Sequence, residues 1–149
     1  MRMRLSVSDE KYDEVKAFLE EKGIEIHDEA EYVLTESNQY PGHIAVRDSR
    51  GAKLMIAVKD IIIIESYGHT MEITASGEVY KSSERLYQLM NMLDPAKFLR
   101  VSNSVIISVS QIRQIIPTFH MKFILLMNNG IQVDVTRNYY KSFKQFFGI

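Results

Sequence analysis

The chain has 149 residues, a length that suits one ordinary domain, or a domain of about 100 residues with a small additional unit. Its hydrophobic fraction of 46% and charged fraction of 25% are typical of a globular protein, and its apolar runs are too short to span a membrane. The absence of cysteine excludes a disulfide framework, a thiol nucleophile and a thiolate zinc site. Because no apolar segment of a secretion signal follows the N-terminus, we expect a cytoplasmic location.

Charge is unevenly distributed along the chain, although the formal net charge is only -1. Residues 1–56 carry a net charge of -4, whereas residues 57–149 carry +3. From Pro95 to the end there are seven basic residues against one acid. The C-terminal part of the chain therefore permits an anionic partner such as nucleic acid.

The first part of the chain, residues 1–41, predicts a small β-α-β unit. Ser8 followed by two acidic residues indicates the start of a helix, which we expect to end near Lys22, before a glycine. Alternating or clustered apolar residues predict short strands around this helix, at residues 3–7, 24–26 and 32–34. The segment Asn38–Gly42, which contains a proline, is the expected linker.

Beyond the linker the pattern changes to many short strands with turn residues between them. The first five are expected at residues 43–47, 53–58, 61–66, 71–74 and 78–81. Their connections are too short for helical crossovers, so they predict antiparallel hairpins. Asn129-Gly130 lies between apolar runs at 123–127 and 131–135 and predicts a type I′ hairpin turn, in which both residues have positive φ.

Two helices are expected among these strands. Ser82 or Ser83 can cap the first, and Asp94-Pro95 ends it. Its apolar face consists of Leu86, Leu89, Met90 and Leu93. A short terminal helix is expected over residues 138–147. The fold class is therefore mainly β, with antiparallel strands and one or two short helices, preceded by the β-α-β unit.

Familiar catalytic motifs are absent from the sequence, and the four histidines lack the spacing of metal ligands. We therefore expect no enzyme activity, no cofactor, no metal and no small-molecule substrate. One apolar stretch, FLRVSNSVIIS at residues 98–108, is instead interrupted by Arg100 and by three small polar residues, 102–104. By its residue types alone, this trio predicts a turn that satisfies its own backbone.

Three segments give that stretch a further meaning when they are taken together. DIIIIESYGH, FLRVSNSVIIS and NNGIQVDVTRNYYKSF, in this order, resemble the LytTR family of bacterial DNA-binding domains over roughly residues 42–149. The matching positions are Asp60-Ile61, Glu65-Ser66, Phe98, Arg100-Val101, Ser104, Asn129-Gly130, Val135 and Arg137. The chain departs from the family pattern at Ile64, Ser102, Ser108 and Thr136. These departures affect the expected DNA target sequence more than the resemblance to the family.

The resemblance implies a mostly β fold that reads double-stranded DNA with side chains on loops. It points to three contact residues, His69, Asn103 and Arg137. Their chemistry suits this role, because Arg can bind guanine through two hydrogen bonds, Asn can pair with adenine, and His can donate to a phosphate or a base. The simpler interpretations stay open: a solvated loop histidine, a self-contained turn, and a surface or ion-paired arginine.

Three further residues complete the expected DNA-binding set: Ser102 in the polar trio, Arg100 before it, and Lys141 in the terminal helix. Arg100 can equally be structural, since its neighbours are apolar. Lys141 can contribute phosphate attraction or simply belong to a solvated helix face.

The function that we expect is sequence-specific binding of promoter DNA by a transcriptional regulator, with residues 42–149 as the DNA-binding domain and a homodimer as the assembly. Residues 1–41 are too few for a phosphate-accepting receiver domain and are expected to serve assembly or regulation. The resemblance also implies a membrane-protein regulator as a partner. The alternative from another class is a protein-interaction module with a basic face on an all-β scaffold. A small hydrolase is the third alternative, and it needs a pocket in which a base and a nucleophile converge.

Overall fold

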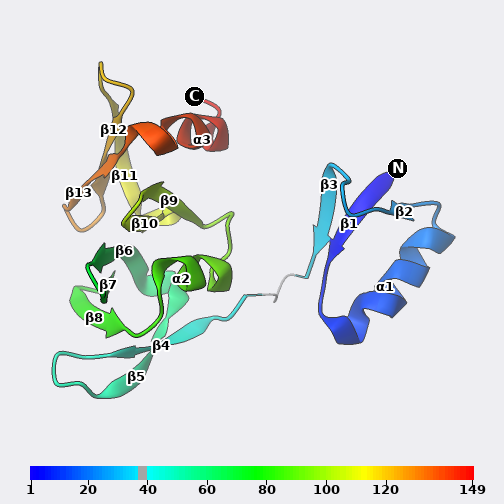
Figure 1. Cartoon of the computed structure of the whole chain (residues 1–149), viewed down its shortest axis with the longest axis horizontal. Helices are drawn as coiled ribbons and strands as arrows, with labels where there is room; N and C mark the ends of the chain where they lie inside the picture. Colours follow the sequence, from blue (N-terminus) through cyan, green and yellow to red (C-terminus); the bar gives the residue numbers. More distant parts are fainter. Residues whose placement is uncertain (37–39) are drawn as a thin grey trace. The chain divides into compact units, whose positions relative to one another are not determined.

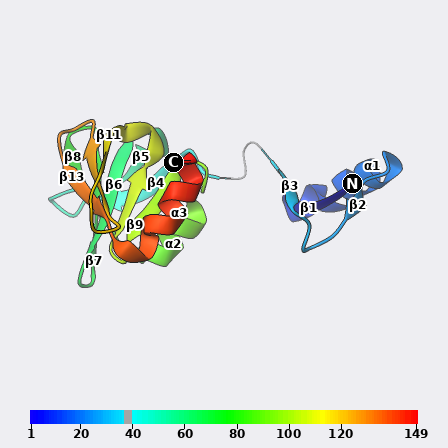
Figure 2. The same cartoon turned by 90° about the horizontal axis from the view of Figure 1, so that it is seen from above.

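The computed structural model describes residues 1–36 and 40–149, and the chain divides into two compact units. Unit 1 comprises Met1–Tyr40 and unit 2 comprises Pro41–Ile149 (Figures 1 and 2). Asn38 and Gln39, which belong to the expected linker, lie outside the described residues. Among the residues described, no sheet is shared between the two units, so they are described separately.

Unit 1 is a β-α-β arrangement with one added strand. Its elements are β1 (Arg2–Ser6), α1 (Asp9–Glu21), β2 (Glu25–Ile26) and β3 (Tyr32–Thr35). The sheet order is β2-β1-β3, and both pairings are parallel. Ser8 precedes the helix in an extended conformation, and Gly23 follows it with a φ of 82°, the left-handed geometry that favours glycine after a helix. The β-α-β prediction is thereby confirmed.

The hydrophobic core of unit 1 is very small. Among the described residues of this unit, Leu19 is the only buried one, and it is still 9% exposed. The strand β3 lies at the edge of the sheet, and its apolar residues are exposed: Tyr32 by 57%, Val33 by 43% and Leu34 by 36%. A unit of about 40 residues with so little buried apolar area has little to stabilise it alone.

Unit 2 contains a seven-stranded antiparallel sheet and a three-stranded antiparallel sheet. The strand orders are β5-β4-β8-β7-β6-β10-β9 and β11-β12-β13. The strands of the larger sheet are β4 (His43–Arg47), β5 (Lys53–Ala57), β6 (Ile61–Tyr67), β7 (Thr70–Ala75), β8 (Glu78–Ser82), β9 (Phe98–Ser102) and β10 (Val105–Ser108). The remaining elements are β11 (Ile112–Pro117), β12 (Phe123–Met127), β13 (Gln132–Val135), α2 (Leu86–Met92), α3 (Arg137–Phe147) and two short 3-10 turns, Val58–Asp60 and Val109–Gln111. The mainly β fold class is confirmed.

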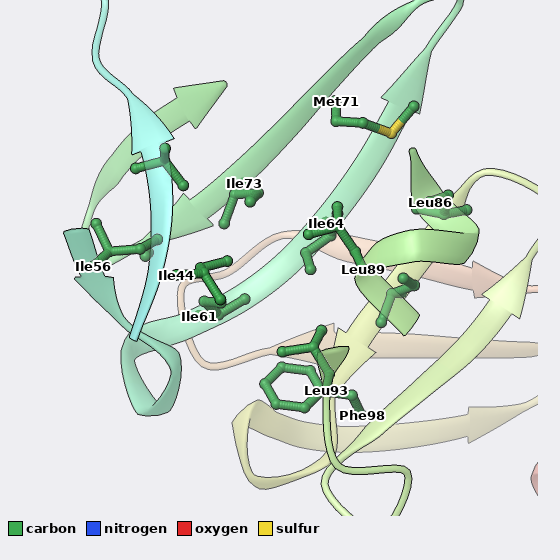
Figure 3. Close-up of a cluster of buried hydrophobic side chains, with 13 residues drawn as sticks. Ile44, Ile56, Ile61, Ile64, Met71, Ile73, Leu86, Leu89, Leu93 and Phe98 are labelled. Atoms are coloured by element: carbon green, nitrogen blue, oxygen red, sulfur yellow. The ribbon is translucent and has the colours of Figure 1, made fainter. Parts of the chain in front are cut away.

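The strand β6 contributes to two hydrophobic cores at once, which explains its unbroken run of isoleucines. Ile61 and Ile64 pack in a core with α2 and β4 to β10, part of which is shown in Figure 3. Ile62 and Ile63 pack on the other side, against β12, β13 and α3. A register shift between Ile61 and Ile63 breaks the strict alternation of faces. A strand that is buried on both faces needs apolar residues at every position.

The expected type I′ turn lies in a different hairpin. At Asn129-Gly130 only the glycine has a positive φ, of 85°, so the predicted geometry is wrong there. The loop instead has three residues, with the last one left-handed, a common hairpin form. Ser76-Gly77, between β7 and β8, has φ values of 50° and 81° and forms the two-residue loop with both residues left-handed.

The start of α2 also differs from the prediction. Ser82 is the last residue of β8, where it pairs with Met71, and its hydroxyl accepts a hydrogen bond from the Glu84 amide at 3.1 Å. The helix begins at Leu86, after Arg85, whose backbone N–H donates to the Gln88 side chain at 2.7 Å. Ser82, one of the two serines expected to cap the helix, is therefore paired in the sheet instead.

Candidate nucleic-acid interface

Aromatic packing fixes the start of α3 beside the loop between β9 and β10. Tyr140 stacks on Phe123 with a ring separation of 5.0 Å, and Phe143 lies 5.1 Å from the same ring. Just before the helix, the Thr136 amide donates to the Val101 carbonyl at 3.0 Å. The first residues of α3, beginning with Arg137, are therefore anchored next to residues 102–104.

An open pocket of about 470 Å³ lies at this junction. Its lining residues come from three segments: Ser102, Asn103, Ser104, Lys122, Thr136, Arg137 and Asn138. Two of these seven residues are cationic and none is acidic. The structure thus brings Arg137 together with Ser102 and Asn103, two other predicted contact residues that lie more than 30 residues earlier in the sequence.

Arg100 points its guanidinium at the loop that it precedes. Its Nε donates to the Ser102 carbonyl at 3.2 Å and its Nη2 donates to the Asn103 carbonyl at 2.7 Å. The Ser102 hydroxyl accepts a hydrogen bond from the Ser104 amide at 3.2 Å. Ser102 is only 8% exposed, so most of this side chain is used inside the turn. The geometry makes Arg100 a residue that holds the loop in shape.

Tyr139 in the first turn of α3 connects the helix to the same loop. Its hydroxyl donates to Asn103 Oδ1 at 3.1 Å, and its ring lies 5.8 Å from the Arg100 guanidinium carbon. One hydrogen bond occupies one lone pair of the amide oxygen, which leaves the NH₂ group and the second lone pair for a ligand. The amide plane of Asn103 is therefore oriented before any ligand arrives.

His69 and Lys141 lie outside the residues that line the pocket. His69 is exposed at the tip of the β6–β7 hairpin, in a two-residue loop whose first residue, Gly68, has a φ of 61°. This hairpin adjoins the loop, because the Ser66 amide donates to the Ser104 carbonyl at 2.8 Å. Lys141 is exposed one helical turn after Arg137, on the same side of α3.

Several residues of this site were not predicted as contacts, and Lys122 and Tyr139 are the two with the clearest roles. Lys122 could have been found from hairpin register, because Phe123 pairs with Val135 and the preceding residue must then lie beside Thr136. No signal in the sequence marks Tyr139, since its role depends on how α3 docks against the loop.

No cluster of three or more metal-ligating side chains occurs within residues 1–36 and 40–149. In the same described part of the chain, no helix has the length and apolar character that crossing a bilayer requires.

Comparison with known proteins identifies the larger part of the chain. The model of the LytTr DNA-binding domain family matches residues 52–148. The chain is 27% identical over 95 residues to the transcriptional regulatory protein LytR of Staphylococcus aureus, and 28% identical over 118 residues to the sensory transduction protein LytT of Bacillus subtilis. These matches cover 64% and 78% of this chain but only 39% and 49% of those proteins. The chain therefore spans less than half the length of these relatives.

A solved LytTr DNA-binding domain from Bacillus cereus has the same fold. The two structures superpose with a TM-score of 0.69 at 22% sequence identity, over 73% of this chain and 99% of the other. With a family model that matches nearly all of unit 2, the chain belongs to the LytTr DNA-binding domain family.

Proposed function

We propose that this protein is a transcriptional regulator of the cytoplasm that recognises a specific promoter sequence through loop side chains of unit 2. The observation that carries the proposal is the convergence of Asn103, Lys122 and Arg137 on one open pocket with no acidic lining residue. Each segment that supplies these residues is anchored by backbone or aromatic contacts, so the backbone positions of the three residues are fixed relative to one another.

The residues of the pocket suit different parts of the DNA, some the bases and some the phosphates. The planar guanidinium of Arg137 can donate two parallel hydrogen bonds to a guanine edge, and the Asn103 amide can bond a base through its free NH₂ group. Lys122 offers a point charge that suits a phosphate oxygen. His69, on the neighbouring hairpin, extends the same surface toward the DNA, while Arg100 acts by holding the loop.

Selection from a random duplex library tests the proposal directly. The full-length protein should enrich a common sequence, and it should bind that duplex at least about 10³-fold more tightly than a scrambled one at physiological salt. Affinity for both duplexes should fall as salt rises, because bound phosphates release counterions. Failure to bind any duplex at low salt would contradict the function and leave the protein-interaction module as the better interpretation.

We also propose that unit 1 joins two copies of the chain through β3. This strand exposes unpaired backbone and apolar side chains at the sheet edge, a combination that invites pairing with another strand. Two copies of β3 related by a twofold axis would form one continuous sheet and cover Val33 of both chains. A homodimer would also enlarge the buried apolar area of a unit in which Leu19 is the one buried residue among those that the structure describes.

The dimer can be tested with a matched pair of edge-strand substitutions in the full-length protein. Val33→Lys should convert the sedimentation mass from dimer to monomer, because it places a charge in the shared edge. Met55→Lys is the control, since Met55 is 60% exposed on β5, an edge strand of unit 2. A wild-type protein that sediments as a monomer, or a Val33 variant that stays dimeric, contradicts the assembly.

A further inference from the structure

The hairpin between β11 and β12 ends in a tip, residues 118–122, whose apolar side chains project into solvent. Phe119 has a relative exposure of 102%, and Met121 is 50% exposed. Residues of an ordinary surface loop are mostly polar. A fully exposed phenylalanine gains no burial free energy from the fold of its own chain.

This hairpin tip is held in shape by its own hydrogen bonds. The Thr118 amide and hydroxyl both donate to the Lys122 carbonyl, at 3.1 Å and 2.8 Å. The His120 amide donates to the Thr118 hydroxyl at 3.5 Å. Phe119 is therefore presented from a closed loop on a two-stranded ladder.

Met121 has a φ of 55°, a left-handed conformation that costs free energy for any residue except glycine. The hairpin between β12 and β13 also has a three-residue loop with a left-handed last residue, and there the residue is Gly130. The hairpin tip thus keeps a methionine where glycine would fit at lower cost. Since half of this side chain remains exposed, burial within the chain gives little compensation.

The position of the hairpin tip connects it to the candidate DNA site. Lys122, which closes the tip, also lines the pocket that contains Asn103 and Arg137. Register accounts for this, because Phe123 pairs with Val135, two residues before the start of α3 at Arg137. The tip therefore adjoins the pocket through Lys122, three residues after Phe119.

We propose that the hairpin tip is a second DNA contact, in which Phe119 packs against bases next to the segment bound by Arg137. This inference rests on the proposed function. DNA suits the tip better than a protein partner, because two apolar side chains beside a cationic pocket are too small a patch for the core of a stable protein interface. A single aromatic side chain is enough to contact a thymine methyl or to enter a base step.

The test uses the full-length protein and the duplex obtained by selection. Phe119→Ala should weaken binding about tenfold, in line with the loss of a base-stacking aromatic, whereas Phe119→Leu should retain most of the affinity. Tyr87→Ala is the matched control, because Tyr87 is an aromatic residue with 63% exposure on α2, outside the pocket lining, and this variant should bind like the wild type. Melting temperatures should be the same for all of these variants, since both rings are exposed.

Two DNA modifications distinguish the modes of contact. Replacing each thymine by uracil in turn identifies a methyl contact, and 2-aminopurine fluorescence reports a base step that opens on binding. Sensitivity in either assay that disappears in Phe119→Ala supports the inference. It is overturned if Phe119→Ala binds like the wild type while Arg137→Ala is weakened, or if Phe119→Ala changes the oligomeric mass instead of DNA affinity. Failure of the wild type to bind any duplex removes the proposed function itself, so the two failures are distinguishable.

Discussion

At the level of single residues, Arg137 and Lys141 lie one helical turn apart on α3 but have different tasks in the proposed complex. Arg137→Ala should cost about 1 to 3 kcal/mol on the selected duplex and much less on a scrambled one, because only the former offers a base partner. Lys141→Ala should weaken both duplexes alike and lower the salt slope by about 1. Titrations of both variants at several salt concentrations measure the difference. Equal losses on both duplexes would make Arg137 an electrostatic residue.

Tyr139 provides a test of how the Asn103 amide is oriented. Tyr139→Phe removes the hydroxyl that donates to Asn103 Oδ1 and keeps the ring beside Arg100. It should weaken binding of the selected duplex by about 1 kcal/mol, the typical value of one hydrogen bond, with little change in melting temperature. In an Asn103→Ala background the same substitution should have no further effect on affinity. Additive losses would show that Tyr139 acts independently of Asn103.

At the level of elements, the β12–β13 loop depends on one left-handed glycine. Gly130→Ala should destabilise unit 2 by about 1 to 2 kcal/mol, because a side chain resists positive φ. No atom lies within 4 Å of the position that the new Cβ would take, so the cost is conformational and not a clash. Gly42→Ala is the control, because Gly42 has equal space and no positive φ. Denaturant unfolding measures both, and equal stability of the two variants would contradict the argument.

The helices and strands show which structural features local sequence patterns can predict. The strands that were predicted and the terminal helix follow from apolar periodicity, because local patterning and sheet burial agree there, whereas β11 was not predicted. The turn type at Asn129-Gly130 could not be predicted, since the dipeptide fits both a two-residue loop and the end of a three-residue loop, and strand register decides between them. Ser82 was predicted as a candidate helix cap for a similar reason: its capping propensity is local, whereas its pairing with Met71 is not.

The candidate site shows the same division between local and long-range information. Asn103 and Arg137 could be named as contacts from the family resemblance of the sequence, and the structure places them in one pocket. Lys122 and Tyr139 enter the site through hairpin register and helix docking, which single-residue patterns do not encode. The intraloop hydrogen bonds of Arg100 likewise required a structure.

At the scale of the whole molecule, the net charge of -1 conceals two units of opposite sign. Unit 1 has five basic and eleven acidic residues, whereas unit 2 has thirteen basic and eight acidic residues. A sequence pI of about 6.4 therefore does not indicate a DNA-binding domain. Phosphate would attract unit 2 and repel unit 1, which agrees with the proposed separation of DNA binding from assembly.

The double burial of β6 has a consequence for how unit 2 opens. Because Ile61 and Ile64 belong to one core while Ile62 and Ile63 belong to the other, neither core can loosen without disturbing this strand. The amide protons of β6 should therefore exchange with solvent only through global unfolding of unit 2, and their protection should equal the full unfolding free energy measured with denaturant. Hydrogen exchange followed by NMR measures this quantity. Protection of the β6 amides well below the global value would mean that the two cores open separately.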